Sequence, residues 1–163
     1  MAGGAMRRKD REITDINEIR DILDACKTAS VAMIDGGMPY VVPLSYGYEL
    51  KGDSLVLYFH CAKEGRKLEI LKRDPKVCFA IFQEGEPLYA ETTPCSSGYY
   101  YSSVIGDGIA SFIEDSAGKQ YALQKMFAQQ AGKVIEFTEE QADSVCVFQI
   151  VSETYTGKRK GKR

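Results

Sequence analysis

The segment from Ser30 to His60, SVAMIDGGMPYVVPLSYGYELKGDSLVLYFH, has the clearest pattern of strands and turns in the chain. It contains three runs rich in β-branched and aromatic residues, separated by Asp35-Gly36-Gly37 and Lys51-Gly52-Asp53. Glycine accepts the backbone angles of tight hairpin turns, so both tripeptides predict turns between neighbouring strands. Strands joined in this way pair antiparallel. The predicted strands are residues 30–34, 40–50 and 54–60.

Pro43 interrupts the second of these strands. Proline has no N–H to donate to a ladder, so this strand is predicted to lie at an edge or to bulge there. Three further strands are predicted over 76–82, which is apolar on both faces and hence central, over 99–114 and over 143–155. Residues 83–98 are polar and predict a loop. Six strands in one chain of this length predict a mainly β fold, a small closed antiparallel barrel with peripheral helices.

Helices are expected around this barrel. Asp15 and Glu18 have the spacing of a capping box, and apolar residues at helical intervals continue that helix to Lys27. Two more helices are predicted over 64–73 and 117–130. The predicted organisation is an N-terminal arm (1–14), one barrel domain (15–156) and a basic C-terminal tail (157–163).

Composition excludes several classes of protein. The chain has 163 residues, of which 44% are hydrophobic and 27% charged, and this mixture argues against disorder, collagen or a coiled coil. No run of about 18 uncharged apolar residues is present, so no membrane span is expected. The N-terminus shows no signal peptide, and a cytoplasmic location is expected.

The cysteines and the charged tail argue against three kinds of site: a disulfide framework, a zinc site and a nucleic-acid site. Five cysteines occur with no C-x-x-C spacing, so reduced thiols are expected rather than a disulfide framework or a zinc site, with Cys78 and Cys146 in the core. Five basic groups lie in residues 157–163, against 16 basic and 23 acidic residues elsewhere. Because no basic face with interleaved aromatic residues accompanies it, the tail is interpreted as a frayed terminus rather than a nucleic-acid site.

His60 is the only histidine, so any mechanism that needs an imidazole must use it. Cys61 follows directly, but neighbours on a strand point to opposite faces, which makes a Cys–His dyad poor geometry. One histidine and scattered cysteines provide no metal-ligand set.

The segment from Tyr58 to Lys67 has the pattern of an anion site. A strand end is followed by Gly65 and by three cations, Lys63, Arg66 and Lys67, at a predicted helix start. Helix N-termini bind anions, whereas cations ordinarily favour the C-terminus. The cluster therefore indicates a bound anion, or else one solvated basic face.

Tyr99 and Tyr101 lie on one face of a predicted strand and Tyr100 on the other. The run could stack against a flat ring, or it could consist of ordinary strand-forming aromatic residues.

These motifs together resemble the pyridoxamine 5′-phosphate oxidase-like split-barrel flavoproteins, and within them the 5-nitroimidazole resistance (nitroreductase) subfamily. The matching pieces are MRRKDREITD (6–15), YVVPLSYGYE (40–49), LYFHCAKEGRKLEIL (57–71), DPKVCF (74–79), YYYSSVIGDGIASFIED (99–115) and TGKR (156–159). The resemblance implies a six-stranded antiparallel split barrel of the FMN-binding type. It also implies a homodimer with FMN in the subunit interface.

The resemblance further implies which residues contact FMN. The flavin ring would be bordered by the backbone of Val42, Pro43, Leu44, Ser45 and Tyr46 and by His60, Cys61 and Ala62. The phosphate would be surrounded by Lys63, Gly65, Arg66 and Lys67. The second subunit would contribute Tyr101, Ser102, Ser103 and Val104.

The expected function is that of an FMN-dependent oxidoreductase that reduces a small electrophile, such as a 5-nitroimidazole, by two electrons, with NADH or NADPH as a candidate reductant. His60 would orient the substrate or supply a proton. Three alternatives stay open: a flavin-binding or redox-sensing protein without rapid turnover, a haem-binding member of the same fold with His60 as axial ligand, and a nucleic-acid accessory protein using the basic tail.

Overall fold

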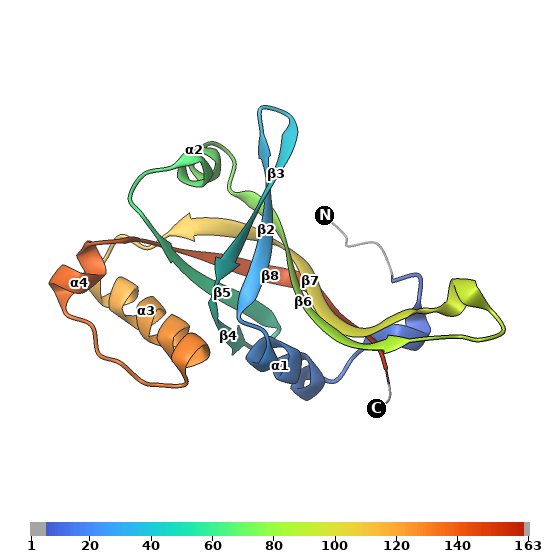
Figure 1. Cartoon of the computed structure of the whole chain (residues 1–163). Coiled ribbons are helices and arrows are strands. Elements are labelled where there is room, and N and C mark those ends of the chain that lie inside the picture. The colour runs from blue at the N-terminus through green and yellow to red at the C-terminus, as the bar shows by residue number, and fades with distance from the viewer. Residues whose placement is uncertain (1–5, 162–163) are drawn as a thin grey trace.

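The computed structural model describes residues 6–161, which form one antiparallel sheet of eight strands with peripheral helices (Figure 1). The strands are β1 (Glu12–Ile13), β2 (Thr28–Asp35), β3 (Met38–Ser45), β4 (Gly47–Lys51), β5 (Ser54–Cys61), β6 (Lys76–Leu88), β7 (Gly98–Phe112) and β8 (Cys146–Lys160). The helices are α1 (Ile16–Ala25), α2 (Arg66–Arg73), α3 (Ser116–Ala131) and α4 (Glu139–Asp143), with short 3₁₀ turns η1 (Lys9–Arg11) and η2 (Pro94–Ser96). No helix of the described residues is long and apolar enough to span a membrane.

The sheet is split rather than closed by hydrogen bonds. Its strand order is β3-β2-β6-β7-β8-β5-β4, with β1 paired to β8. The two outermost strands, β3 and β4, are consecutive in the chain and are joined through Tyr46 alone. The antiparallel, mainly β class predicted from the sequence is confirmed, whereas the prediction of a closed barrel is wrong.

Tyr46 explains why one predicted strand became two. Its side chain is fully buried, and its hydroxyl donates to the carbonyl oxygens of Leu23, at 2.7 Å, and Cys26, at 3.2 Å. The chain therefore turns inward at Tyr46 and not at Pro43. Pro43 lies within β3 opposite Ser30, and β3 is an edge strand, as the proline predicted.

Two strands extend further than local sequence indicated. β6 and β7 continue past the barrel as a long two-stranded arm (Figure 1), so residues 83–88 and 98 of the predicted loop over 83–98 are strand, whereas residues 89–97 form the connection at the tip. β8 pairs with β7 as far as Lys160, so residues 157–160 belong to the sheet and are not a frayed tail. Met1–Ala5 of the predicted arm and Lys162–Arg163 of the predicted tail lie outside the described residues.

Helices close the ends of the barrel and cover one side of it. α1 and α2 place Ile22, Leu23 and Leu71 in the interior core, and α3 packs on β4 and β5 over a second, smaller core. Asp15 caps α1 by accepting a hydrogen bond from the Asn17 N–H, at 2.9 Å. Glu18 does not complete the predicted capping box and instead pairs with Arg159, at 3.0 Å.

Alternation along β6 corrects the expectation for Cys78. Val77, Phe79 and Ile81 point into the core, so Cys78 is exposed on the outer face. β6 is nevertheless central, between β2 and β7, as predicted. Cys146, at the start of β8, is half-buried rather than a core residue.

Candidate functional site

The predicted anion segment folds as a strand end, a short loop and a helix start. β5 ends at Cys61, and α2 begins at Arg66 after Gly65, whose φ of +140° is rarely adopted by residues with side chains. The N–H groups of Leu68 and Glu69 both point back to the Gly65 carbonyl oxygen, at 3.0 and 3.3 Å. The first N–H groups of a helix have no acceptor within the helix, so this end of α2 can bind an anion.

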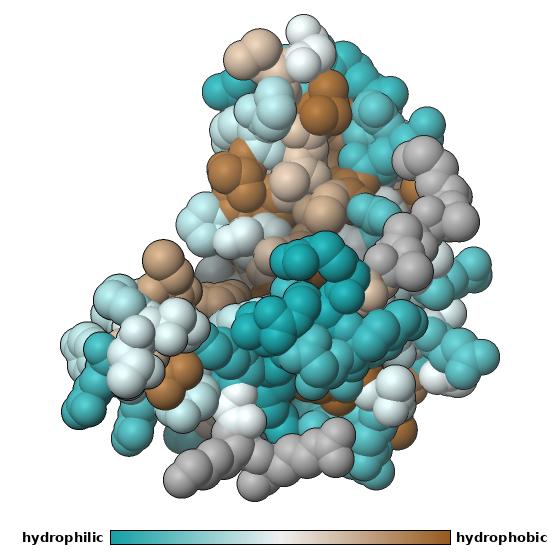
Figure 2. Space-filling view, turned by 90° about the vertical axis from the view of Figure 1, so that its right-hand side faces the viewer, coloured by the Kyte–Doolittle hydropathy of each residue, from teal (hydrophilic) through white to brown (hydrophobic). Residues whose placement is uncertain are grey.

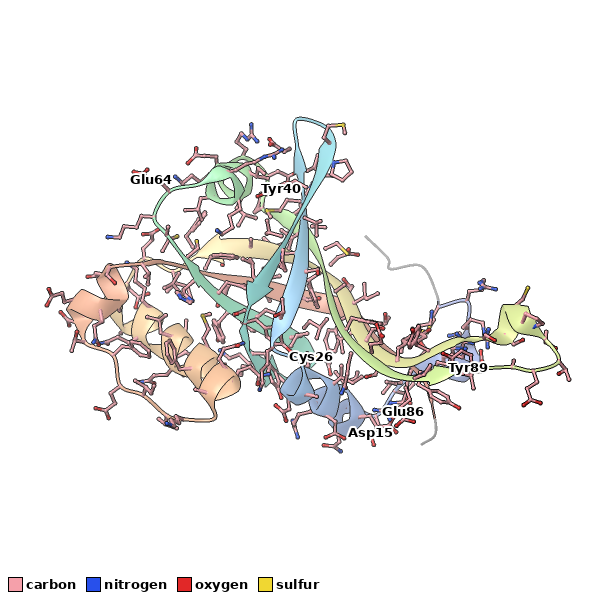
Figure 3. All side chains as sticks on the ribbon, in the orientation of Figure 1. Asp15, Cys26, Tyr40, Glu64, Glu86 and Tyr89 are labelled. Atoms are coloured by element: carbon pink, nitrogen blue, oxygen red, sulfur yellow. The ribbon has the colours of Figure 1, made fainter. Side chains whose placement is uncertain are left out.

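Arg66 is held by the β2–β3 hairpin. Its Nε lies 2.8 Å from Asp35 Oδ2, and its guanidinium lies 4.3 Å from the centroid of the Tyr40 ring. Arg73 binds the other oxygen of Asp35, at 2.5 Å. These two arginines lower the pKa of Asp35. Arg66 is therefore already neutralised in part, and it positions α2 against β3, as Figure 3 shows for Tyr40 beside α2.

The two lysines of the cluster differ from Arg66 in their exposure and in their ion pairing. Lys63 is exposed in the loop and Lys67 is half-buried in the first turn of α2. Within residues 6–161, neither lysine has a carboxylate oxygen within 4.0 Å. Glu64 lies between them in sequence, on the loop that leads into α2 (Figure 3). Lys63 and Lys67 are thus the cations that remain available to an anion at this helix start.

The sheet is open between its two end strands, β3 and β4, and their unpaired edges together with the nearby end of β5 are called the seam below. The Val42–Tyr46 segment lies along this seam. Pairing of Gly47 with Tyr58 places Tyr46 beside the end of β5. Val42 and Leu44 pack against the interior core, and Pro43 and Ser45 are exposed. The outward side chains of this segment are therefore Pro43 and Ser45, and the expected contact of its backbone with the flavin ring stays a prediction.

His60 is exposed on the outer face of β5, opposite Val147. Cys61 points to the other face and packs against the interior core. Because β5 continues through both residues, they cannot form a dyad, as the sequence indicated. Partial desolvation lowers the pKa of His60, so at neutral pH its imidazole is mostly uncharged.

Tyr101 is not brought to this seam within one chain. Strand pairing joins Pro43 on β3 to Ser30 on β2, then to Ala80 on β6 and to Ile105 on β7. At the usual strand spacing, β7 therefore lies roughly 14 Å from β3 along the sheet. Of the remaining residues predicted on β7, Ser102, Ser103 and Val104 are buried. The predicted site therefore separates into a seam around His60 and α2 and a second region around Tyr101.

The region around Tyr101 has chemistry that the sequence did not predict. The Tyr101 hydroxyl accepts a hydrogen bond from Arg11, at 3.4 Å, its ring stacks on Phe82, and the Lys158 ammonium lies 6.0 Å from its centroid. Partial burial opposes ionisation, but hydrogen bonds from Arg11 and Lys158 lower the pKa of Tyr101. Arg11 and Lys158 stand at opposite ends of the chain, and only the pairing of β1, β8 and β7 brings them together.

A cavity of about 580 Å³ opens beside Tyr101, at the base of the β6–β7 arm. It is lined by residues of β6, β7 and the end of β8: Gln83, Glu84, Tyr100, Ser102, Arg159 and Lys160 among them. Figure 3 shows Glu86, which also lines it, on this arm.

The outer face of β3, β2, β6 and β7 is largely apolar, and no helix among residues 6–161 covers it (Figure 1). Its exposed residues include Ile34, Val41, Phe82, Ile105 and Ile109, each at least 46% exposed. Figure 2 views the molecule from this side and shows apolar side chains gathered in its upper part, above a hydrophilic region. Tyr101 and Pro43 lie on this same face, at its two sides.

Comparison with known proteins identifies relatives of this fold. A family model described as pyridoxamine 5′-phosphate oxidase matches residues 15–159. The chain matches no curated protein significantly. A candidate 5-nitroimidazole antibiotic resistance protein from Bacteroides thetaiotaomicron VPI-5482 is similar in structure, with a TM-score of 0.78 and 29% identity over 91% of this chain and 86% of that one.

Two further solved structures share the fold at lower identity. The FAD and haem binding protein from Mycobacterium smegmatis has a TM-score of 0.77 and 18% identity over 93% of this chain and 74% of that chain. A FAD-binding protein from Mesorhizobium loti has a TM-score of 0.66 and 21% identity over 93% of this chain and 98% of that chain. At these identities the likeness supports the split-barrel fold.

Proposed function

The chain belongs to the pyridoxamine 5′-phosphate oxidase family, and from this premise we propose that it is an FMN-dependent oxidoreductase that works as a homodimer. The reaction is two-electron reduction of a small electrophile, with 5-nitroimidazoles as the first substrates to test. The similarity to the Bacteroides protein supports this choice of substrate. The observation that carries the proposal is the anion site at the start of α2.

That site fits the phosphate of FMN. It combines the N-terminus of α2, two lysines (Lys63 and Lys67) that have no carboxylate oxygen within 4.0 Å among residues 6–161, and Gly65, where a Cβ would meet nothing within 4 Å. In this arrangement Arg66 orients the helix through Asp35, and the two lysines hold the charge of the phosphate. The backbone of Val42–Tyr46 borders the ring along the seam.

When bound, FMN would supply the two-electron redox chemistry of the reaction. In this proposal the protein binds the cofactor, shields it from solvent and donates one proton to the substrate. His60, mostly uncharged at neutral pH, holds a hydrogen bond to the substrate and donates a proton only after it has itself been protonated. The lowered pKa therefore places its acid role below the pH expected of an ordinary histidine.

The second subunit completes the cofactor site in this proposal. In one chain the Tyr101–Val104 segment lies too far from the seam to reach the same flavin. The uncovered apolar face carries Pro43 on one side and Tyr101 on the other, so two copies packed through this face bring the seam of one against Tyr101 of the other. NADH or NADPH is the proposed source of electrons.

The deciding experiment is a titration of flavin-free protein with FMN, FAD and riboflavin. Replacing Lys63 and Lys67 together by alanine is expected to weaken FMN binding by about 10²–10⁴-fold, because each charge-assisted contact contributes roughly 1.5–3 kcal/mol. Riboflavin, which has no phosphate, is expected to bind both proteins equally. Lys72→Ala is the control, since Lys72 lies at the far end of α2 and pairs with Glu69.

Each outcome of the titration has a clear meaning. If FMN binds the double variant as tightly as the wild type, the phosphate assignment is wrong. If FAD binds much more tightly than FMN, the cofactor is FAD. If the protein binds flavin but transfers no electrons to nitroimidazoles, a flavin-binding or redox-sensing role replaces the enzymatic one.

A haem-binding role is the second candidate, and one observation favours it. His60 is the only histidine, is exposed, and is mostly uncharged at neutral pH, which is the state in which an imidazole binds iron. A Soret band in the purified protein that disappears in His60→Ala would support this role. A flavin spectrum without a Soret band would exclude it.

A further inference from the structure

Two cysteines face each other where β5 ends and β8 begins. Cys61 is the last residue of β5, Cys146 is the first residue of β8, and the antiparallel register places them directly opposite one another. Directly opposed residues in such a ladder have Cα atoms about 4.5–5.5 Å apart. Disulfides span Cα separations of about 4.4–6.8 Å, so this pair can be bridged without moving the backbone far.

The rest of the cysteines do not share this arrangement. Cys26 is buried after the end of α1, Cys78 lies on the outer face of β6 opposite Asp107, and Cys95 lies in η2 at the tip of the arm. Cys61 and Cys146 are both half-buried and free, and their thiols are close enough for each to perturb the pKa of the other. No spacing in the sequence predicted this pair.

We propose that Cys61 and Cys146 are a redox modification site, at which peroxide closes a reversible disulfide between β5 and β8. This site is separate from the proposed flavin chemistry but lies next to the proposed phosphate site. Cys61 leads directly into the loop that carries Lys63, and Lys67 lies near enough to influence the Cys61 thiol. The disulfide ties the end of β5 to β8 directly before the loop that carries the anion site.

The chemistry balances with hydrogen peroxide as the oxidant. One thiolate attacks a peroxide oxygen, the S–O bond forms, the O–O bond breaks, and the leaving hydroxide takes up a proton to become water. The second thiol, as it loses its proton, attacks the sulfenic sulfur and displaces a second hydroxide, which also becomes water. Two thiols lose two electrons in total, and one peroxide is reduced to two waters.

A source of peroxide lies close by if the chain binds flavin as proposed, because a reduced flavin that reacts with dioxygen produces it. Only this supply depends on the proposed function, since the opposed thiols are a property of the sheet. Burial raises the pKa of Cys61 to about 11 and also raises that of Cys146. The thiolate is the reactive form, so the bond is expected to form slowly at pH 7 and about tenfold faster per pH unit above it.

The test maps the bond by mass spectrometry. The purified full-length protein is treated with hydrogen peroxide, its remaining thiols are alkylated, and it is digested without reduction. The expected product is a peptide pair joined through Cys61 and Cys146, formed faster at pH 8 than at pH 7 and removed by dithiothreitol. Cys61→Ser and Cys146→Ser should each abolish it, and the matched controls Cys78→Ser and Cys95→Ser should retain it.

Thermal melting gives a second reading on the same samples. Oxidised wild type is expected to melt several degrees above the reduced protein, whereas the Cys61→Ser variant shows no such difference. Peroxide that consumes thiols only as sulfinic acid, or only as bonds between chains through Cys78 or Cys95, would overturn the proposal. Flavin absorbance is recorded in parallel, so a protein that forms the cross-link without binding flavin refutes the proposed function and leaves the redox site standing.

Discussion

At the scale of single residues, His60 is the side chain whose protonation state most affects the proposed reaction. It is exposed, lies at the end of β5 beside the anion site, and has a lowered pKa because of partial desolvation. A group of this kind is mostly uncharged at pH 7 and gains its proton as the pH falls through a value below 6.5. The proposed acid step therefore has a definite pH dependence.

His60→Ala is expected to retain flavin while it slows reoxidation of reduced flavin by a nitroaromatic compound. General acid catalysis contributes about 10²–10⁴-fold, so the loss should be large at pH 5.5 and smaller at pH 8. Stopped-flow absorbance separates this step from flavin reduction by NADH or NADPH, which should be nearly unaffected. Unchanged reoxidation at both pH values would show that His60 only lines the site.

Glu49 is the second residue whose pKa shift leads to a testable pH dependence, in this case of stability. Its carboxylate accepts hydrogen bonds from the hydroxyls of Tyr121, at 2.7 Å, and Tyr58, at 3.2 Å, and pairs with Lys51 and Lys125. Partial burial acts in the opposite direction, but Tyr121, Lys51 and Lys125 lower the pKa of Glu49 to about 2. The group thus ties α3 to β4 in its charged form.

Because the folded-state pKa of Glu49 lies below the ordinary value of about 4.5, its stabilising contribution is complete above that value and is lost as the pH falls toward 2. The contribution is roughly 2–3 kcal/mol. Urea unfolding at pH 7 and pH 3 should show wild type losing more stability than Glu49→Gln over this interval. An equal loss in both proteins would mean that other carboxylates control acid unfolding.

At the scale of elements, the contact between β4 and α3 depends on a glycine. Gly47 lies against the backbone of Lys125 and Met126, and a Cβ there would overlap both residues. The same helix also holds the bend between β3 and β4, because the Gln130 amide donates to the Tyr46 carbonyl oxygen at 2.8 Å. Close backbone approach at Gly47 therefore sets how α3 covers the sheet.

Gly47→Ala should push α3 away from β4 and lower the free energy of unfolding by roughly 1–3 kcal/mol or more, as overpacking does in a tight contact. Chemical denaturation provides the measurement. Gly161→Ala is the matched control, because its Cβ would come no closer than 3.7 Å to any neighbour and should leave stability nearly unchanged. A Gly47→Ala protein as stable as the wild type would show that α3 can shift without cost.

At the scale of the whole molecule, the uncovered apolar face is the surface through which the proposed dimer forms. The five large apolar side chains named above are exposed on it, whereas α3 covers β4 and β5 on another side of the barrel. A continuous patch of this kind on a sheet is typical of a surface that packs against another molecule. In the proposed dimer that molecule is a second copy of the chain.

Sedimentation should give twice the chain mass of 18.1 kDa for the wild type. Ile105→Lys places a charge in the middle of the face and is expected to give a monomer that also loses flavin, since the shared site is then incomplete. Val134→Lys is the control, because Val134 is 86% exposed in the segment between α3 and α4, away from this face. A monomeric Ile105→Lys protein with full flavin content would contradict the shared site.

Local sequence was sufficient to predict the features that depend on neighbouring residues. The hairpin turns at Gly36 and Gly52, both with positive φ, and the cap of α1 at Asp15 follow from local backbone chemistry. The helix predicted from residue 64 is present as α2, which begins two residues later, at Arg66. Alternation and turn spacing also sufficed for the antiparallel class, and the family motifs sufficed for the split barrel. The candidate residues on the His60 seam were identified at this level.

Tertiary structure alone decided the features that join distant parts of the chain. The inward turn at Tyr46 depends on carbonyl groups at the end of α1, and the length of β8 depends on its ladder with β7. The surroundings of Tyr101 and the opposed Cys61 and Cys146 arise only when strands far apart in sequence pair in one register. Local periodicity indicates which face a side chain occupies, whereas register is set by the packing of whole faces, and no short stretch of sequence contains that information.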